Sequence, residues 1–236
     1  MSESRHLPPS VVGALDVPET TSVASGNGLP EPTRVDLWCD PVCPWAWATA
    51  RWLGEVDCHR PLDLRLRVMS LAVLNERKDD VSLRYRLLAR HGSVPARLCI
   101  AAEQQHGPAA LARLYPALAR RFHQKPVQRG VTALRDALDE AQLPGELMHR
   151  AGSDAFDQAL LASHQAARAA YGADVGTPLL RLRDAQDRTV TLFGPVLEHV
   201  PQGLDAVRAW DALTTLTQVD GFRELKRHRG SEPVLD

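Results

Sequence analysis

Residues 35–47 read VDLWCDPVCPWAW, and this stretch decides the fold of the chain. Residues 35–39 alternate enough between apolar and polar side chains to predict a β-strand, and Asp-Pro-Val at 40–42 is typical of a turn. A helix is predicted over residues 44–56, because proline is well tolerated in a first helical turn. Its apolar residues spread around the circumference, which predicts that most of the helix is buried. Cys43 therefore stands where a strand ends and a helix begins.

The segments that follow complete an α/β pattern. Leucine and valine alternate with aspartate and arginine over residues 62–68, which predicts a second strand with one buried face. The strand-helix-strand unit implies parallel pairing with a right-handed crossover. Three amphipathic stripes then predict helices from about residue 79 to 171. Strands at 179–182 and 189–193, followed by an amphipathic helix over 204–216, complete the order β-α-β, helices, β-β-α.

This order predicts a divided domain. Residues 1–32 hold five prolines and no sustained periodicity, and they are expected to form a disordered leader. Residues 33–75 and 174–236 are expected to form one α/β domain. Residues 76–173 are expected to form an all-helical insertion domain between its two halves.

Composition excludes several classes of function. With 44% hydrophobic and 24% charged residues, the 236-residue chain can bury a core of ordinary size. Its formal net charge of -1 gives no electrostatic reason to expect nucleic acid or a membrane as partner. No apolar run approaches the ~20 residues needed to cross a bilayer, and the first ten residues do not begin a secretory signal. The sequence predicts a cytoplasmic protein.

Four cysteines, at positions 39, 43, 58 and 99, do not predict a disulfide scaffold in a chain of this length. No pair has zinc-ligand spacing with a matching distal pair, so no metal site is predicted. Cys43 stands out because a thiol at a helix N-terminus faces unpaired backbone N–H groups and the positive end of the helix dipole. Both favour the thiolate, so the pKa of Cys43 is predicted to fall below the free value of about 8.5.

Residues near and far are expected to shape the site around Cys43. Pro44 removes one amide and presets the first helical turn, and Trp45 can shelter the sulfur and offer a flat surface to a substrate. Far along the chain, Thr177-Pro178 stands immediately before the third strand, where a proline removes no needed ladder bond. A cis bond there would expose the backbone groups of Thr177 to an incoming chain or ligand.

The combination of these features resembles the DsbA-like branch of the thioredoxin superfamily. Cys-Pro-Trp-x opens the first helix, Thr-Pro precedes the third strand, and helices are inserted between them. The sequence is more similar still to the mycothiol-dependent nitroreductases of actinobacteria. The similarity spans roughly residues 34–236 and is carried by the segments Asp40–Trp47, Val68–Glu76, Ala101–Gln104, Asp174–Pro178, Phe193–Pro195 and Phe222–Lys226. It implies an α/β thioredoxin fold with a large all-helical insertion.

The resemblance also implies a chemistry. Members of this family reduce disulfides or electron-poor nitro compounds with the low-molecular-weight thiol mycothiol. They have a nucleophilic cysteine where Cys43 stands and a cis-proline where Pro178 stands. Mycothiol is thus the expected cosubstrate, a disulfide or nitro-aromatic compound is the expected substrate, and no tightly bound cofactor is expected. A homodimer, and glutathione in place of mycothiol, are left open.

One position departs from the family pattern. The best-known pattern is Cys-Pro-Trp-Cys, and Ala46 stands here in place of the second cysteine. This favours a monothiol cycle, in which Cys43 becomes S-mycothiolated and a second mycothiol resolves the adduct. Cys58 is roughly 22 Å along the helix and cannot resolve it. Cys39 could do so only with its Cα within about 7 Å of that of Cys43, and a buried strand thiol is the favoured interpretation.

Asn75 and His164 complete the candidate site. Asn75 follows the second strand in a segment that resembles the family, and a role in binding substrate or thiol rests on that resemblance. His164 lies on an apolar helical stripe, where a satisfied core histidine is the usual finding and an active-site role is the alternative.

Two other functions fit parts of the pattern. Kappa-class transferases and chromene-carboxylate isomerases share the fold and the insertion, but they usually place serine at the nucleophile, so Cys43 argues against them. A thioredoxin-fold binding module that lost redox activity with its second cysteine is the other alternative. An accessible Cys43 of low pKa would distinguish a redox enzyme from such a module.

Overall fold

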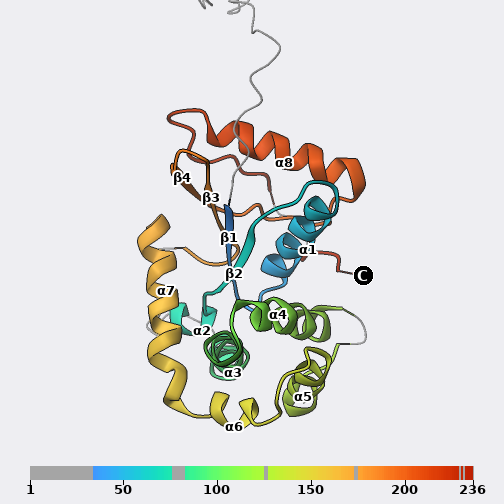
Figure 1. Ribbon diagram of the computed structural model, residues 1–236, viewed down its shortest axis with the longest axis vertical. Coiled ribbons are helices and arrows are strands. Elements are labelled where there is room, and N and C mark those ends of the chain that lie inside the picture. Colours follow the sequence, from blue (N-terminus) through green and yellow to red (C-terminus); the bar gives the residue numbers. More distant parts are fainter. Residues whose placement is uncertain are drawn as a thin grey trace, which may run out of the picture.

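A small sheet stands between helices on both faces, and further helices form a layer at one of its ends (Figure 1). This computed structural model describes residues 34–75, 83–124, 127–172, 175–228, 230 and 232–235, and for residues 83–92 it describes the backbone alone. The expected leader, residues 1–32, lies outside the described residues.

The sheet has four strands in the order β2-β1-β3-β4. They are β1 (Arg34–Cys39), β2 (Leu64–Val68), β3 (Leu179–Arg183) and β4 (Thr189–Phe193). β1 pairs parallel with β2 and antiparallel with β3, which in turn pairs antiparallel with β4. The predicted parallel β-α-β unit is confirmed, and the central strand β1 is buried on both faces.

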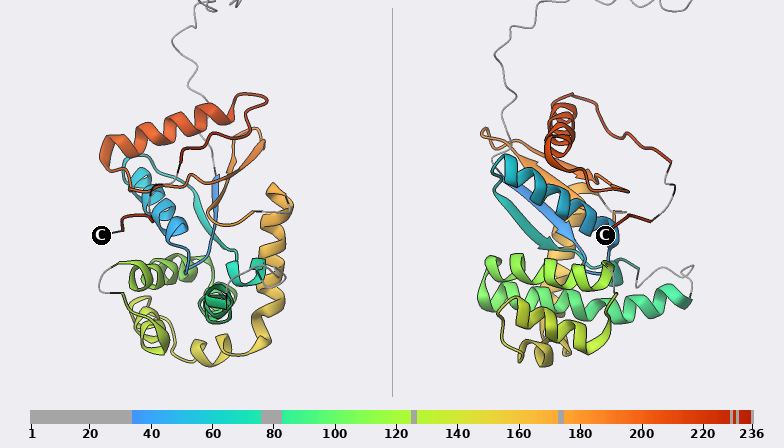
Figure 2. Two further views of the ribbon diagram at one scale, coloured as in Figure 1. Left: turned by 180° about the vertical axis from the view of Figure 1, so that it is seen from behind. Right: turned by 90° about the vertical axis from the view of Figure 1, so that its right-hand side faces the viewer.

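The two faces of β1 pack against different helices, because side chains alternate along a strand. Val35, Leu37 and Cys39 belong to the core that includes α1 (Pro44–His59) and α8 (Gly203–Thr217). Those two helices meet through Trp52 and Trp210, whose rings are 5.9 Å apart. Trp38 faces the other way and packs in a second cluster with residues of β3 and α7 (Asp157–Tyr171). Figure 2 shows α7 and α8 on opposite sides of the sheet.

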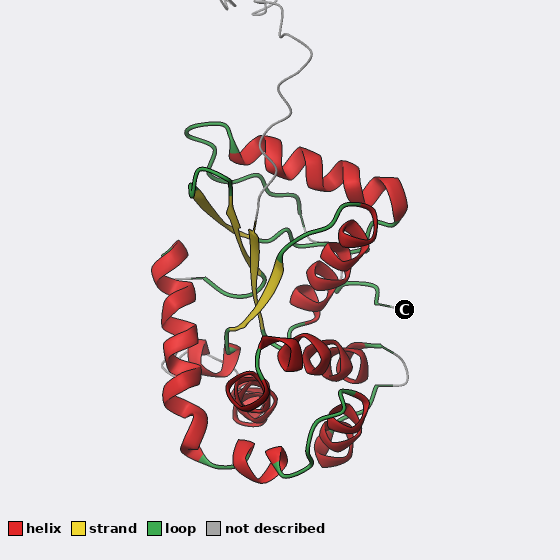
Figure 3. Cartoon of the chain, viewed as in Figure 1, coloured by secondary structure: helices red, strands yellow, loops and turns green. Residues whose placement is uncertain are grey.

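Most of the helices between β2 and β3 form the layer at the end of the sheet where β1 ends and α1 begins, and the last of them, α7, continues along one face of the sheet (Figure 3). In chain order they are α2 (Leu71–Asn75), α3 (Leu83–His106), α4 (Pro108–His123), α5 (Gly130–Glu140), α6 (Leu147–Ala151), a 3-10 turn (Asp154–Phe156) and α7. The predicted α4 stripe is buried along its whole length, from Leu111 to Phe122. Val131 and Tyr171 of the other stripes are exposed, because they lie in the end turns of α5 and α7.

A buried carboxylate lies in the central strand. Asp36 is 1% exposed and forms ion pairs with Arg34, Arg67 and Arg181, at 3.0, 3.3 and 3.1 Å. Burial alone raises the pKa of Asp36, but the hydrogen bonds from Arg181 and Arg34 outweigh it and hold the pKa below its usual value. Arg181 also stacks over the ring of Trp38, 4.9 Å from its centroid. The part of this sheet face around Asp36 is therefore charged, whereas the part that packs under α7 is apolar.

Candidate active site

Cys43 and Thr177 meet at the N-terminus of α1. Cys43 is the N-cap residue, with an extended backbone, and Pro44 follows it in the first helical turn. The thiol of Cys43 donates a hydrogen bond to the carbonyl oxygen of Thr177 at 3.6 Å. The Thr177–Pro178 peptide bond is cis, and Pro178 leads directly into β3. Two motifs that lie far apart in the sequence thus form one site.

The thiol of Cys43 is more deeply buried than its position at a helix N-terminus suggested. Its residue is 4% exposed, and burial raises the pKa of Cys43 above the ordinary cysteine value. The side chain of Thr177 and the backbone N–H groups of Ala46 and Trp45 act to lower that pKa, but their effect does not outweigh the loss of solvent around the thiol. The expectation of a lowered pKa is therefore wrong for this conformation, in which Cys43 is a protonated thiol.

The turn before Cys43 is built around the carboxylate of Asp40. One oxygen accepts the N–H of Val42 at 2.9 Å, and the other accepts the N–H of Leu71 at 2.7 Å. The backbone oxygen of Asp40 accepts the N–H of Cys43 at 3.0 Å. Asp40 is fully buried, which raises its pKa to about 6 even though both N–H bonds favour the charged form. The turn is thus tied to the first residue of α2.

A histidine of the insertion holds the same turn from the other side. Nε2 of His123, at the end of α4, donates to the carbonyl oxygen of Pro41 at 2.8 Å. Burial lowers the pKa of His123 to about 4, against the opposing effect of that hydrogen bond. His123 is therefore neutral at physiological pH, with its proton on Nε2.

The other candidate residues lie at different distances from this centre. Trp45 is half-buried and follows Pro44, whereas Trp47 is buried and meets Tyr115 edge-to-face, with 6.1 Å between ring centroids. Asn75 ends α2 and donates to the carbonyl oxygen of Leu71 at 2.6 Å, so it stands on the helix that contacts the turn.

His164 is buried on α7, where burial lowers its pKa and Nδ1 has no hydrogen-bond partner among the described residues. No hydrogen bond or ion pair in the described part of the chain joins His164 to Cys43. The unpartnered Nδ1 differs from a satisfied core histidine, and a role for His164 in binding substrate or thiol stays a prediction.

All four cysteines are free thiols. Cys39 is buried in β1 and donates to the carbonyl oxygen of Arg67 at 3.6 Å, and burial strongly raises its pKa. Cys99 is buried on α3, and Cys58 is exposed near the far end of α1. Within the described residues, no group of three or more potential ligands could hold a metal ion, and no helix is long and apolar enough to cross a membrane.

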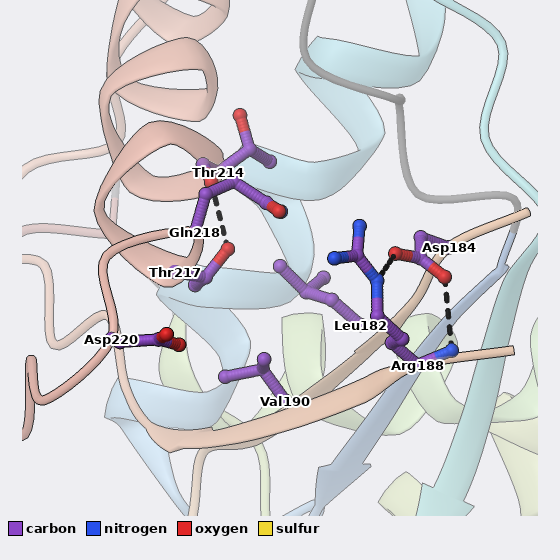
Figure 4. Close-up of a pocket in the computed structure, with 8 residues that line it drawn as sticks. All are labelled: Leu182, Asp184, Arg188, Val190, Thr214, Thr217, Gln218 and Asp220. Atoms are coloured by element: carbon purple, nitrogen blue, oxygen red, sulfur yellow. Dashed lines mark hydrogen bonds and ion pairs between the residues drawn. The ribbon is translucent and has the colours of Figure 1, made fainter. Parts of the chain in front are cut away.

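A separate hollow lies at the opposite end of the sheet (Figure 4). It measures about 140 Å³ and is bounded by the β3–β4 hairpin and the end of α8, with Leu182 and Thr214 among its lining residues. Leu182 pairs with Val35 at the start of β1, whereas Cys43 follows the end of that strand. The pair formed by Asp184 and Arg188 in this hollow holds the hairpin turn.

The model of a family described as mycothiol-dependent nitroreductase Rv2466c matches residues 42–227, a span that includes both Cys43-Pro44-Trp45 and Thr177-Pro178. The chain belongs to the Rv2466c-like family. It is thus a member of a family of thiol-dependent oxidoreductases.

The chain is also similar to a curated protein and to several solved structures. "Uncharacterized protein Rv2286c" of Mycobacterium tuberculosis is 29% identical over 215 residues, covering 86% of this chain and 85% of that protein. A putative protein disulfide isomerase from Nitrosomonas europaea has a TM-score of 0.51 at 16% identity, covering 80% of this chain and 98% of the other. The probable DsbA oxidoreductase SCO1869 from Streptomyces coelicolor has a TM-score of 0.50 at 18% identity, covering 83% and 93%. The fold is therefore the DsbA-like thioredoxin fold.

The fold alone does not fix the reaction. A 2-hydroxychromene-2-carboxylate isomerase has a TM-score of 0.51 at 14% identity, covering 78% of this chain and 94% of the isomerase. Proteins with this fold therefore need not share one reaction.

Sequence reasoning missed two residues of the site in this Rv2466c-like chain. The sequence predicts only a turn at Asp40, although aspartate in a turn is a known signal for a side chain that accepts the backbone N–H two residues later. His123 gave no local signal, because its partner Pro41 lies 82 residues earlier in the chain.

Proposed function

We propose that this chain is a monothiol reductase in which Cys43 is the nucleophile and mycothiol is the reductant. The observation that carries the proposal is the placement of Cys43 at the N-terminus of α1, against the carbonyl oxygen of Thr177. In the closed conformation Cys43 is buried with a raised pKa, so the accessible, acidic thiol that distinguishes a redox enzyme from a binding module requires the site to open. Once substrate or movement opens it, backbone N–H groups of the first helical turn can stabilise a thiolate there. The choice of mycothiol as the thiol and of nitro compounds as a substrate class rests on the description of the family.

The other cysteines support a cycle with one protein thiol. Ala46 occupies the position one turn along α1 where a resolving cysteine would stand. Cys39 is engaged with the carbonyl oxygen of Arg67, Cys99 is buried in the insertion, and Cys58 is near the other end of α1. An external thiol must therefore complete the cycle.

For a disulfide substrate, the cycle is ordinary thiol–disulfide exchange. The Cys43 thiolate attacks a mixed disulfide of mycothiol, forms a bond to the mycothiol sulfur and releases the other half as a thiolate. A second mycothiol thiolate attacks this adduct, which yields mycothiol disulfide and restores the Cys43 thiolate. For a nitro compound, two mycothiols supply two electrons and two protons, and the products are a nitroso compound, water and mycothiol disulfide.

The remaining residues of the site have roles in binding. Trp45 offers a half-buried aromatic surface beside the nucleophile, which suits a nitro-aromatic ring. The backbone of Thr177 faces Cys43 and can pair with an extended substrate, with Pro178 shaping the same loop. Asn75 is assigned to the same binding surface through α2. Such a cycle suits the reducing cytoplasm.

The test is mass spectrometry of the intact protein and its peptides after incubation with oxidised mycothiol and, separately, with oxidised glutathione. We expect one mycothiol adduct, on Cys43, and its removal by added mycothiol. If glutathione forms an adduct on Cys43 and mycothiol does not, then glutathione is the reductant and mycothiol is not. Absence of any adduct on Cys43 would favour a binding module instead.

A further inference from the structure

The hydroxyl of Thr49 makes a long-range contact that the thiol exchange described above does not use. Thr49 lies in the second turn of α1 and is fully buried. Its oxygen is 3.0 Å from the carbonyl oxygen of Trp45, in its own helix, and 2.7 Å from that of Pro195, 146 residues later in the chain. A hydroxyl has one proton to donate, and the shorter distance assigns it to Pro195. Pro195 ends Phe193–Pro195, one of the segments that carry the family resemblance, and the thiol cycle leaves that segment without a role.

The residue before Pro195 is joined to the loop that carries Thr177 and Pro178, the substrate-binding loop. The N–H of Gly194 donates to the carbonyl oxygen of Pro178 at 2.9 Å, directly beyond the last residue pair of the β3–β4 ladder. Pro178 follows Thr177, whose carbonyl oxygen accepts the hydrogen bond from Cys43. Because the backbone hydrogen bonds of the sheet continue between the loop before β3 and the loop after β4, these two loops should move as one unit.

These contacts close a circuit around the nucleophile. α1 carries Cys43 at its N-cap and Thr49 in its second turn, and a helix holds two such positions at a fixed distance. The joined loops place Thr177 against the sulfur and Pro195 against the hydroxyl. For the loops to move off the sulfur together, the bond between Thr49 and Pro195 must break.

Of these two contacts between helix and loops, the one made by Thr49 is the stronger. The Cys43 thiol is a weak donor at 3.6 Å from its acceptor, whereas the Thr49 hydroxyl is a good donor at 2.7 Å from its acceptor. Breaking the Thr49 contact also leaves polar atoms unpaired in a buried place, which adds the free-energy cost of their desolvation. The closed state of the site therefore depends mainly on Thr49.

We propose that Thr49 is a positioning residue that holds the substrate-binding loop closed over Cys43. While its hydroxyl is bonded to Pro195, Thr177 covers the sulfur and shields the thiol from solvent. When that bond breaks, the two loops move away together, and Cys43 becomes accessible to solvent and to substrate. The inference rests on the proposed function in naming Cys43 as the nucleophile and Thr177 as part of the surface that binds substrate.

The experiment is a time course of iodoacetamide alkylation at pH 7.5, followed by peptide mass spectrometry, in the wild type and in Thr49→Val. Valine has the shape of threonine and lacks the hydroxyl. In the wild type Cys43 should react faster than Cys99, because movement of the loops exposes Cys43, whereas Cys99 is buried on α3 and requires wider unfolding. In Thr49→Val the rate at Cys43 should rise about tenfold, which corresponds to about 1.4 kcal/mol lost from the closed state.

Two variants serve as controls, and the exposed Cys58 normalises the rates in every protein. Thr49→Ser keeps the hydroxyl and should keep the wild-type rate at Cys43. Thr214→Val removes a similar local bond without a remote one, because Thr214 of α8 donates to carbonyl oxygens of its own helix, at 3.0 and 3.1 Å. The rate at Cys43 in Thr214→Val should therefore equal that of the wild type.

Three outcomes would overturn the inference. They are an unchanged rate at Cys43 in Thr49→Val, an equal acceleration in Thr214→Val, and equal rates at Cys43 and Cys99 in the wild type, since Cys43 would then be exposed only by unfolding. Because alkylation needs no reductase activity, a protein that shows the acceleration but forms no mycothiol adduct loses only the proposed function.

A second measurement covers the case in which Thr49→Val does not fold. The carbonyl carbon of Pro195 is followed by NMR in Cys58→Ser, with Thr49 in place, before and after alkylation of Cys43. The added group does not fit beneath Thr177 in the closed site, so the loops should move off and the Pro195 carbonyl should lose its hydrogen bond, which shifts its resonance upfield. An unchanged resonance would show that Thr177 moves without Pro195 and would refute the coupling.

Discussion

The sulfur of Cys43 lies 3.6 Å from the carbonyl oxygen of Thr177, 134 residues later in the chain. A carbonyl oxygen accepts hydrogen bonds and donates none, so Cys43 makes this contact as a protonated thiol that donates its S–H. The same contact covers the sulfur and removes it from water. The resting site is thus closed, and reactivity depends on opening it.

Exposure should decide which cysteine reacts first in the resting protein. Cys58 is exposed, whereas Cys43 is buried with a raised pKa. At pH 7 we expect iodoacetamide to modify Cys58 at least about ten times faster than Cys43, because alkylation requires an accessible thiolate. Peptide mass spectrometry over a time course measures both rates, with the protein unfolded in urea as the control that equalises them. Faster modification of Cys43 in the folded protein would contradict the closed resting site.

Serine substitutions should separate the nucleophile from the other thiols. Cys43→Ser should abolish mycothiol-dependent reduction, because a hydroxyl cannot form the mixed disulfide. Each folded molecule should keep most of the wild-type activity in the other three variants, Cys39→Ser, Cys58→Ser and Cys99→Ser. Steady-state rates, corrected for folded fraction by circular dichroism, make the comparison. A reversible Cys39–Cys43 disulfide in peptide maps during turnover would make this a dithiol enzyme instead.

Ala46→Cys should convert the cycle from one protein thiol to two. The new thiol would stand one helical turn from Cys43, in the Cys-x-x-Cys arrangement, and could attack the mycothiol adduct within the protein. We expect the adduct to disappear without added mycothiol and an internal disulfide to take its place. Ala46 is fully buried, so the thermal midpoint of the variant should be compared with that of Ala46→Ser. Persistence of the adduct in folded Ala46→Cys would show that position 46 cannot reach it.

His123 should make the fold less stable in acid. Its pKa of about 4 in the folded chain lies below the unfolded value of about 6.5, so the unfolded chain binds the extra proton between these values. Its contribution is complete above pH 6.5 and is lost as the pH falls towards 4, by about 2 kcal/mol at pH 5. The raised pKa of Asp40 acts in the opposite direction, since folded Asp40 holds its proton more tightly. Asp40 is present in both the wild type and His123→Gln, so comparing these two proteins cancels the contribution of Asp40. Glutamine also keeps an N–H donor at position 123.

Urea unfolding at pH 7.5 and pH 5 measures this effect. The wild type should lose about 2 kcal/mol more of its unfolding free energy over this interval than His123→Gln does. Equal losses in the two proteins would show that His123 is not held neutral by its burial against Pro41.

The carboxylate of Asp36 should be required for stability. Asp36→Asn would leave three arginines on a buried sheet face without their shared anion, and we expect a loss of about 3 kcal/mol at pH 7. Asp63→Asn is the control, because the ion pair of Asp63 with Arg65 is solvent-exposed and should contribute less than about 1 kcal/mol. Urea unfolding measures both. Because the pKa of folded Asp36 is lowered, the wild-type advantage should decline as the pH falls through 4.

Local patterns in the sequence were enough to predict the first strands and helices and the place of Cys43 at the start of α1. Alternation in β1 and β2, proline at the start of α1 and the stripe on α4 are local patterns, and local patterns are read directly from neighbouring residues. The replacement of a second cysteine by Ala46 is likewise visible without a structure. So is the similarity that led to the Rv2466c-like family.

The electrostatic state of Cys43, in contrast, depends on how remote segments pack around it. The N-terminus of α1 favours a thiolate through local backbone groups, and the sequence therefore predicted a lowered pKa for Cys43. Burial reverses that direction, and burial comes from segments that are remote in the sequence, with Thr177 over the sulfur, Leu71 on Asp40 and His123 on Pro41. Desolvation depends on everything that packs around a group, whereas a helix N-terminus depends on one turn of chain. That difference in range is why the position of Cys43 at the start of α1 could be predicted from the sequence and its protonation state could not.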